Sequence, residues 1–581
     1  MSARAGVIVA MLLCATLALA PSAHARSEPP AADFFGLNVE GLFSGNFAPS
    51  YVWPSYVSTF TRGGIQTGRT PAFWDRIEPN APNGGNHSYN WEVLDRTAET
   101  LARFHARMTI ILMHSPAWAS SGAYDGAYAV YPPRDPNDFG VFAQAVVARY
   151  GPNGSFWRAR ADLPRMAPVS YEIWNEENHS YYYRPAPDPA GYVRIYNAAR
   201  SAIRQLDPNA NVVVGGVVWN DDAQFIRGLY NAGGAGWQPD GIALHPYATT
   251  VIGTVINLRR VYQTLQSLGQ HPPLYLTELG WWAAQPGDPG ATDTTQGPMA
   301  DTTRAGVLSM LADAAVRSDC NIESVMIYDV IEPGPNLYDT NANANVSGLA
   351  LQAAAARYSD QPADSLGVCG AGSPVSRLLP LELDPRPAGN GCFAPFTTYR
   401  SFPIEYARVF FSAEGGGTGM AITDGHGVTS YCPAGADAGK PMKVWAEVSW
   451  DTAPAIARSA DYDCRPACAV VAGSLPIPRV EPVVQRAEGK AAKVGRIALA
   501  VRPRPLRVGA RTRLVFTVTR RVGKRRRPVV GATVHYGGLL LRTNKRGRTT
   551  RSALYNRPGT YQVIVTKLGA HRAVSSVRVV R

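Results

Sequence analysis

Short hydrophobic runs alternate with amphipathic stretches through residues 33–358. The stretches 91–104, 138–150, 189–206 and 302–316 have the apolar spacing of helices. Alternating strands and helices favour a parallel sheet, so eight such units predict an α/β fold, a (β/α)8 TIM barrel. A doubly wound open sheet is the alternative, but Gly41–Gly45 is not the glycine-rich phosphate loop that it needs. The eight expected strands are Phe35–Val39, Gly64–Gly68, Met108–Met113, Val169–Trp174, Val212–Val217, Gly241–His245, Leu274–Thr277 and Ser324–Tyr328.

The pattern changes after residue 358, where short β-like runs replace the helical stretches. Those between Cys392 and Cys468 predict a small cysteine-containing, all-β module over residues 369–475. Residues 476–494 are rich in proline and charge and are typical of a linker. Apolar and polar residues then alternate clearly through 495–581, which predicts a C-terminal β-sandwich of the immunoglobulin-like type.

The N-terminus has the pattern of a secretory signal peptide over residues 1–25. Arg4 precedes the apolar run Gly6–Ala20, and Ala23-His-Ala25 fits the small-x-small cleavage site. No later run reaches about 18 apolar residues, so no membrane span is expected. We therefore expect a secreted, extracellular protein, with association to the cell wall as one form of that location.

Six cysteines remain outside the apolar run, an even number that suggests disulfides in an exported chain. Six cysteines allow 15 pairings, and the sequence does not choose among them. A metal site at Cys464-x-x-x-Cys468 is the rival interpretation, although no second close pair accompanies it.

Charge is distributed unevenly along the 581 residues. Residues 491–581 hold 23 of the 57 Lys and Arg and none of the 44 Asp and Glu, which leaves 34 basic and 44 acidic residues elsewhere. The basic C-terminal domain suggests an anionic partner, such as a cell-wall polymer. An arginine-rich solvated face with no partner is the alternative. Nucleic acid is disfavoured because few aromatics interleave with the basic runs.

Two glutamates follow or end predicted barrel strands. Glu176 lies in the run Tyr171–Asn178 at the tip of strand four, and Glu278 lies in the run Leu274–Gly280 at the tip of strand seven. Chemistry in a TIM barrel lies at the C-terminal ends of the strands, so both carboxylates should reach one mouth. Glycoside hydrolysis needs such a pair, one to protonate the leaving oxygen and the other to attack the anomeric carbon. Glu172, of the same strand parity as Glu176, is the alternative catalytic residue, or a buried charge paired with an arginine.

Three strand ends together resemble glycoside hydrolase clan A, the TIM-barrel retaining glycosidases, and are similar to families 5, 39 and 42. They are Trp174-Asn-Glu176, Thr277-Glu278 and His245-Pro-Tyr247. The resemblance covers residues 33–358 and implies a retaining double displacement with Glu176 as acid/base and Glu278 as nucleophile. It also implies that six further residues bind substrate: Arg69, His114, Asn175, His245, Tyr247 and Trp282.

The supporting residues fit that chemistry. Arg69 would keep Glu278 ionised, Tyr247 could donate to the same carboxylate, and Asn175 could bind the sugar 2-hydroxyl. A hydrophobic wall beside Glu176 would favour its protonated form, and the candidates are Trp118 and Trp219. Where the clan usually has a tryptophan at strand eight this chain has Tyr328, so Tyr328, Trp281 or Trp282 is expected to form the sugar platform.

Alternatives exist for the outer residues and for the whole chain. His114 and His245 could be structural histidines, and Tyr181–Tyr183 could line a sugar cleft or cover the barrel rim. A metal enzyme would want a His-x-His on strand one, which is missing, and no P-loop or dinucleotide motif is found, so no cofactor is expected. We expect a glycosidase acting on β-linked oligo- or polysaccharides. A non-catalytic carbohydrate-binding protein and a glycosyl-transferring enzyme are the alternatives.

Overall fold

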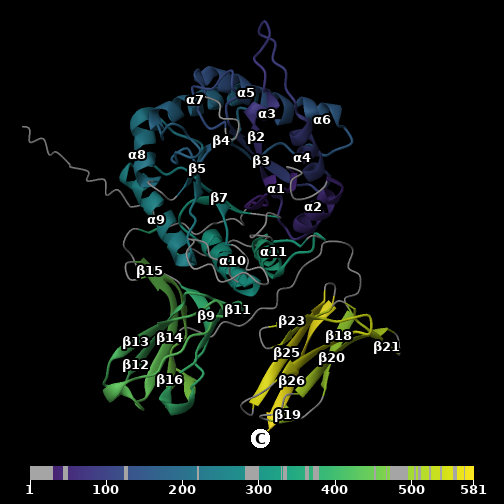
Figure 1. Cartoon of the computed structure of the whole chain (residues 1–581), viewed down its shortest axis with the longest axis vertical. Coiled ribbons are helices and arrows are strands. Elements are labelled where there is room, and N and C mark those ends of the chain that lie inside the picture. Colours follow the sequence, from purple (N-terminus) through teal and green to yellow (C-terminus); the bar gives the residue numbers. More distant parts are fainter. Residues whose placement is uncertain are drawn as a thin grey trace, which may run out of the picture. The chain divides into compact units, whose positions relative to one another are not determined.

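The structure is a computed structural model of the whole chain (Figure 1). It divides into two compact units, residues 1–482 and 483–581. The residues that it describes are 31–43, 50–122, 129–218, 222–281, 300–328, 330, 337–339, 341–359, 366–370, 378–450, 453–465, 467–471, 495–502, 506–507, 512–522, 525–530, 532–536, 539–553, 559–567 and 570–580. The predicted signal peptide lies outside these ranges.

Eight parallel strands close into a barrel, in the order β1 to β8 with β8 pairing back to β1 (Figure 1). This confirms the predicted TIM barrel and excludes the open doubly wound sheet. The strands are nearly all buried because the barrel interior faces one side and the helices cover the other. Their bounds are β1 Phe35–Asn38, β2 Thr67–Phe73, β3 Arg107–Met113, β4 Ser170–Asn175, β5 Val212–Val218, β6 Ile242–His245, β7 Leu274–Leu279 and β8 Ile322–Ile327.

Helices surround the barrel and begin at recognisable sequence signals. Asp135 and Asp188 cap α5 and α7 through their carboxylates, with a proline in the first turn of each helix. Thr250 caps α9 through its hydroxyl, which accepts from the Gly253 backbone N–H. The helices are α1 Glu40–Phe43, α2 Trp53–Arg62, α3 Trp74–Ile77, α4 Glu92–Arg103, α5 Pro136–Tyr150, α6 Ser155–Ala159, α7 Pro189–Leu206, α8 Asp222–Gly233, α9 Val251–Ser267, α10 Asp301–Val316 and α11 Val346–Tyr358.

Strand β2 is the one barrel strand whose predicted position was clearly wrong. It was expected at Gly64–Gly68 with Arg69 at its end, but it spans Thr67–Phe73 and contains Arg69. Gly63 and Gly64 instead form the turn that ends α2, and Gly64 takes the positive φ of 85° that glycine tolerates. The real strand, TGRTPAF, is too polar for a hydrophobic-run search to detect.

A second, nine-stranded sheet follows the barrel in the same unit, in the order β11-β10-β9-β15-β14-β12-β13 with β16 and β17 alongside. Its disulfides are Cys392–Cys432 and Cys464–Cys468, while Cys320–Cys369 ties the segment after α10 to residues beyond α11. The expectation of disulfides is confirmed. The strands are β9 Leu379–Asp384, β10 Phe396–Tyr399, β11 Phe402–Pro403, β12 Arg408–Ala413, β13 Thr418–Ile422, β14 Met442–Trp450, β15 Ala453–Ser459, β16 Tyr462–Cys464 and β17 Cys468–Val470.

The second unit is also all-β, as predicted, with the strand order β21-β20-β18-β26-β25-β22-β23. Leu514, Phe516 and Val518 of β20 lie in its core, in agreement with the predicted alternation. Its immunoglobulin-like connectivity stays a prediction. The strands are β18 Gly495–Arg502, β19 Leu506–Arg507, β20 Thr512–Val522, β21 Arg525–Pro528, β22 Thr533–Tyr536, β23 Leu539–Arg542, β24 Arg548–Ala553, β25 Gly559–Lys567 and β26 Ala570–Val580. Within the described ranges no helix is both long enough and apolar enough to cross a membrane.

Candidate active site

The two predicted carboxylates meet at the barrel mouth. Glu176 follows the last residue of β4, and Glu278 is the fifth residue of β7. One oxygen of each, together with a ring nitrogen of His245 on β6, form a trio whose atoms lie within 4.8 Å of one another. The Glu176 and Glu278 side chains are 13% and 14% exposed, whereas His245 is buried. Both carboxylates are therefore held by the protein and still open to a ligand.

The backbone around Glu176 has an unusual conformation. Trp174 and Glu176 both have positive φ, 68° and 49°, which non-glycine residues rarely adopt. Two glycines on the neighbouring β5 allow the close approach. A Cβ at Gly216 would come within 1.9 Å of His245 Nε2, and one at Gly215 within 2.4 Å of Glu177 Oε2. The glycine pair thus makes room for the bend that carries Glu176.

Arg69 is the centre of the buried network beneath the mouth. Its guanidinium donates to both oxygens of Glu172, at 2.8 and 2.9 Å, and to Glu278 Oε1 at 2.5 Å. It also donates to the amide oxygens of Asn38 and Asn175, at 2.8 and 2.9 Å. One side chain therefore connects β1, β2, β4 and β7 and fixes the position of Glu278 relative to the strand that carries Glu176.

Glu278 is held in its ionised form. Burial favours the neutral acid, but His245 and Arg69, together with hydrogen bonds from Arg69 and Tyr247, outweigh burial and lower the pKa of Glu278 below its ordinary value. Tyr247 donates its hydroxyl to Glu278 Oε2 at 3.0 Å. Burial and the nearby Glu278 and Glu176 raise the pKa of Tyr247 well above its usual range, so it stays a donor.

His245 and Asn175 complete the cluster. His245 Nδ1 lies 2.8 Å from Glu176 Oε1 and 3.6 Å from Glu278 Oε2, so it bridges the two carboxylates. Asn175 accepts from Arg69 through its amide oxygen, which directs the amide nitrogen away from the guanidinium. Six of the eight predicted site residues are thus brought together: Arg69, Asn175, Glu176, His245, Tyr247 and Glu278.

The other predicted residues fall into two groups. His114 follows β3, but its Nδ1 lies 3.0 Å from Asp75 Oδ1 and its ring packs on Phe73, so its described contacts do not join it to the two carboxylates. Trp282 and Trp219 lie outside the described residues. Trp118, the other candidate for a hydrophobic wall beside Glu176, donates its indole N–H to the backbone oxygen of Glu78 at 3.1 Å.

The tyrosine run after Glu176 and the tryptophan after β7 differ in exposure. Trp281 is buried and donates to Thr249 O at 3.1 Å, so its ring does not offer a face for stacking. Tyr183 is buried, whereas Tyr181 is 40% exposed. Burial, and then the charges of Glu176 and Glu278, raise the pKa of Tyr182.

Sequence reasoning missed one member of the network and undervalued another. Asn38 on β1 joins Arg69 to the Thr277 backbone, to which it donates at 2.9 Å. A search for polar residues inside a predicted strand would have found it. Glu172 was considered, and its interpretation as a buried charge paired with an arginine agrees with its bidentate contact to Arg69.

A metal ion would have to compete with these contacts. Glu176, His245 and Glu278 could in principle offer it three ligand atoms. Arg69 already binds one Glu278 oxygen and Tyr247 the other, and His245 Nδ1 is within hydrogen-bonding distance of Glu176. The arginine charge beside Glu278 further opposes a cation. Cys464 and Cys468, the other suggested metal site, form a disulfide.

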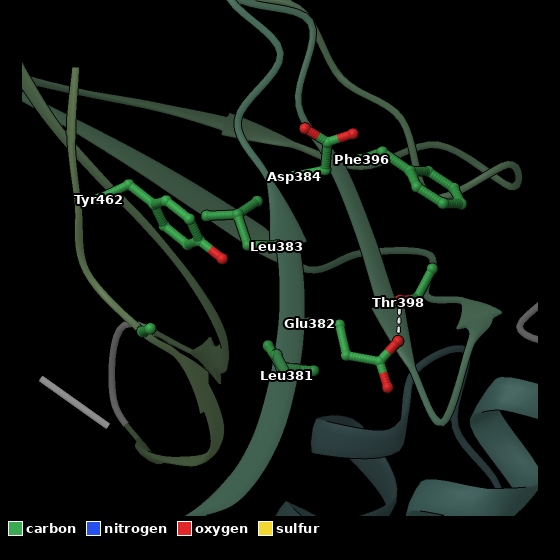
Figure 2. A pocket seen from close by; sticks show the side chains of 8 residues that line it. Leu381, Glu382, Leu383, Asp384, Phe396, Thr398 and Tyr462 are labelled. Atoms are coloured by element: carbon green, nitrogen blue, oxygen red, sulfur yellow. Dashed lines mark hydrogen bonds between the residues drawn. The ribbon is translucent and has the colours of Figure 1, made fainter. Parts of the chain in front are cut away.

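A separate small hollow lies on the second sheet, between β9, β10 and β16 (Figure 2). Its carboxylates are occupied: Glu382 accepts from Thr398 Oγ1 at 2.6 Å, and Asp384 pairs with Arg386 at 2.8 Å. Figure 2 shows Phe396 and Tyr462 on opposite sides of Leu383, not facing each other across a cavity. These contacts make the barrel mouth the stronger candidate site.

No protein-family model and no curated protein matches the chain. Among solved structures, it is similar to a monomeric beta-xylosidase from Caulobacter crescentus CB15, with 14% identity and a TM-score of 0.44 over 67% of this chain and 84% of that one. A family 39 glycoside hydrolase from Bacteroides cellulosilyticus WH2 has 16% identity and a TM-score of 0.41, covering 69% and 80%. An endo-beta-1,4-mannanase from Thermotoga petrophila has 13% and 0.38, covering 74% and 97%. The expected likeness to TIM-barrel glycoside hydrolases is thus found among solved structures, and it concerns the fold.

Proposed function

We propose that the chain is a retaining glycosidase that cleaves β-glycosidic O-linkages in oligo- or polysaccharides. The observation that carries the proposal is the pair of partly exposed carboxylates whose oxygens lie within 4.8 Å of each other. Carboxyl groups separated by about 5–5.5 Å act by double displacement, whereas inverting enzymes need about 6.5–9.5 Å to admit a water molecule. The observed spacing supports the retaining mechanism.

The two glutamates have partners that suit different roles. Glu278 sits beside the Arg69 cation and accepts from Tyr247, so it is the carboxylate kept ionised for attack on the anomeric carbon. Glu176 is the acid that protonates the leaving oxygen, and His245 orients it. In the second step, ionised Glu176 takes a proton from a water molecule as the water oxygen attacks the anomeric carbon. The bond between that carbon and Glu278 breaks, and the anomeric carbon regains its original configuration.

Substrate binding is assigned to residues around the pair. We propose that the Asn175 amide nitrogen donates to the sugar 2-hydroxyl, a contact that strengthens in the transition state. His114 and Trp282 are further proposed contacts. We also propose that the enzyme works outside the cytoplasm, supported by three disulfides and the N-terminal pattern.

The test is a release assay on aryl β-glycosides and plant, fungal and bacterial polysaccharides. Glu278→Ala should lower kcat by on the order of 10⁴-fold, and added azide should partly restore release by entering the space left by the carboxylate. Glu92→Ala, at a side chain that is 71% exposed on α4, is the matched control and should match the wild type.

Three outcomes would contradict the proposal. Release that survives Glu278→Ala would mean another nucleophile. Product of inverted configuration from the wild type, read by NMR of the first-formed anomer, would exclude the double displacement. Polysaccharide binding with no release from any substrate would favour a non-catalytic binding protein.

A further inference from the structure

The second unit places exposed arginines on one face of a β-sheet. In β20 the even-numbered residues Leu514, Phe516 and Val518 are buried, so the odd-numbered residues face outward. Cross-strand partners share a face, so the register extends this outer face to the neighbouring strands. Arg502 of β18 pairs with Val515, Arg548 of β24 pairs with Thr517, and Arg526 of β21 pairs with Arg521.

Five arginines therefore share this outer face, and all five are exposed. We call them the arginine face: Arg502, Arg513, Arg521, Arg526 and Arg548. Figure 1 shows the neighbouring strands β18 and β20, with β21 at the outer edge. Arg513 and Arg521 are eight residues apart on β20, about 26 Å at about 3.3 Å per residue, and Arg502 and Arg548 lie between them on the neighbouring strands, so positive charge is distributed along the whole face.

No acidic side chain occurs in residues 491–581, since the segment has 23 Lys and Arg and no Asp or Glu. The register even sets like charges opposite each other, Arg520 against Arg527 and Arg521 against Arg526. Opposed like charges destabilise a strand pair, so the fold bears a cost that an anionic ligand would relieve. Guanidinium groups prefer carboxylate and phosphate, which they bind through two parallel hydrogen bonds.

The side chains between the arginines indicate which anion fits. Most of them are small or hydroxylated, with Ala498 and Ala500 on β18 and Thr517, Thr519 and Thr550 on β20 and β24, and Val515 of β20 is apolar. Among the described residues of this face there is no aromatic ring on which a nucleic acid base could stack. Threonine hydroxyls can hydrogen-bond sugar hydroxyls, and a face that extends over several strands suits an extended polymer.

We propose that the arginine face binds an anionic polysaccharide, one whose sugars carry carboxylate or phosphate groups. The inference is independent of the proposed glycosidase activity, because it concerns binding by another unit and is measured without turnover. It assigns the anionic partner suggested by the charge of the C-terminal segment to a defined surface.

The experiment measures binding of the full chain to polygalacturonate, to its fully methyl-esterified form and to a phosphorylated mannan. We expect binding to at least one charged polymer, no binding to the neutral ester, and at least tenfold weaker binding when NaCl is raised from about 0.05 to 0.5 M. The two charged polymers distinguish carboxylate from phosphate as the recognised group.

Matched triple variants test the surface itself. Arg502→Gln, Arg513→Gln and Arg548→Gln together should raise Kd at least about tenfold. The control removes the same charge elsewhere in the unit, with Arg507→Gln, Arg527→Gln and Arg578→Gln, all exposed and off this face, and should change Kd less than about threefold. Arg→Lys at the first three positions keeps the charge and shows, by an unchanged Tm, that the surface tolerates substitution.

Three results would overturn the proposal. Equal loss in both triple variants would mean that net charge, not this face, determines binding. No binding to either charged polymer at low salt would exclude anionic polysaccharides as the ligand. Tighter binding to double- or single-stranded DNA than to the charged polysaccharides at equal salt would assign the surface to nucleic acid.

Discussion

Two buried ion networks in the first unit have opposite balances of charge. At the barrel mouth, one arginine, Arg69, faces the carboxylates of Glu172 and Glu278. Between α10, α11 and β10, one carboxylate, Asp313, faces two arginines, Arg357 and Arg400. The first network has more negative groups than positive ones, and the second has the reverse.

The two networks also differ in how fully their carboxylates are occupied. Each oxygen of Asp313 accepts from one arginine and one tyrosine, and its side chain is fully buried. Tyr358 and Tyr399 supply the tyrosine hydroxyls, at 3.0 and 2.5 Å. Glu278, by contrast, is 14% exposed, and Glu176 beside it is 13% exposed. A saturated, inaccessible carboxylate joins the barrel to the second sheet, whereas an accessible one can react.

The largest expected effect is that of Arg69→Met, which breaks the first network at its centre. Glu172 and Glu278 would stay buried without their counter-ion, at a cost of about 3–5 kcal/mol in the free energy of unfolding. Release should also fall by more than about 10³-fold because Glu278 loses its position and its charge partner. Chemical denaturation and the release assay measure the two effects.

A double variant separates the loss of stability from the loss of activity. Arg69→Met with Glu172→Gln removes one uncompensated charge and should recover part of the stability, but no activity. Recovered activity would contradict the assignment of Arg69 to Glu278.

Glu176→Gln comes next and should affect chemistry alone. Losing the general acid should lower kcat by about 10²–10⁴-fold, with a smaller loss on aryl glycosides whose leaving groups need no proton. The isosteric amide can still contact His245, so the Tm should stay near that of the wild type. An equal loss on good and poor leaving groups would contradict the acid role.

Asp313→Asn should lower the stability of the protein and leave its activity unchanged. Removing the charge leaves Arg357 and Arg400 without their carboxylate, which should lower the free energy of unfolding by about 3 kcal/mol. The folded variant should release product at the wild-type rate, because Asp313 makes no described contact with the barrel-mouth cluster. A loss of kcat in the folded variant would show that the two networks are coupled.

Tyr247→Phe gives the smallest expected effect, through the pKa of Glu278. The pKa of Glu278 in the folded protein lies below its ordinary value of 4.5. Glu278 is therefore still ionised at pH 4.5 and is protonated only as the pH falls through the lowered pKa. Removing the hydroxyl raises the pKa, so the acid limb of kcat/KM should move to higher pH. Loss of one charged hydrogen bond should also lower kcat/KM about tenfold. An unmoved acid limb would mean that Tyr247 acts only on substrate.

The elements predicted best were those whose chemistry is local. Seven of the eight barrel strands were expected within a few residues, because a strand buried on both faces is a continuous apolar run. The positions of Glu176 and Glu278 followed from those strand ends. Strand β2 was misplaced because Arg69 faces the barrel interior, where ionic partners replace apolar packing.

Two contacts were expected, those of Arg69 and Tyr247 with Glu278, but the other contacts in this cluster could not be predicted. His245 contacts Glu176, which is 69 residues away in the sequence. Asn38 joins Arg69 to Thr277, which is 239 residues from Asn38. His114 was expected among the substrate contacts, yet its nearest ionic partner is Asp75, on the short helix after β2. Such pairings depend on the strand register and on where each chain segment bends.

The sequence by itself determined the order of strands and helices, the two strand-end glutamates, the all-β character of the C-terminal modules and their uneven charge, since each depends on neighbouring residues. Tertiary structure decided which cysteines pair, how Asn38 and His245 join the cluster at the barrel mouth, and that arginines from four strands share one face. The physical reason is that these pairings join residues far apart in the chain, and only barrel closure and strand register set the distances between them.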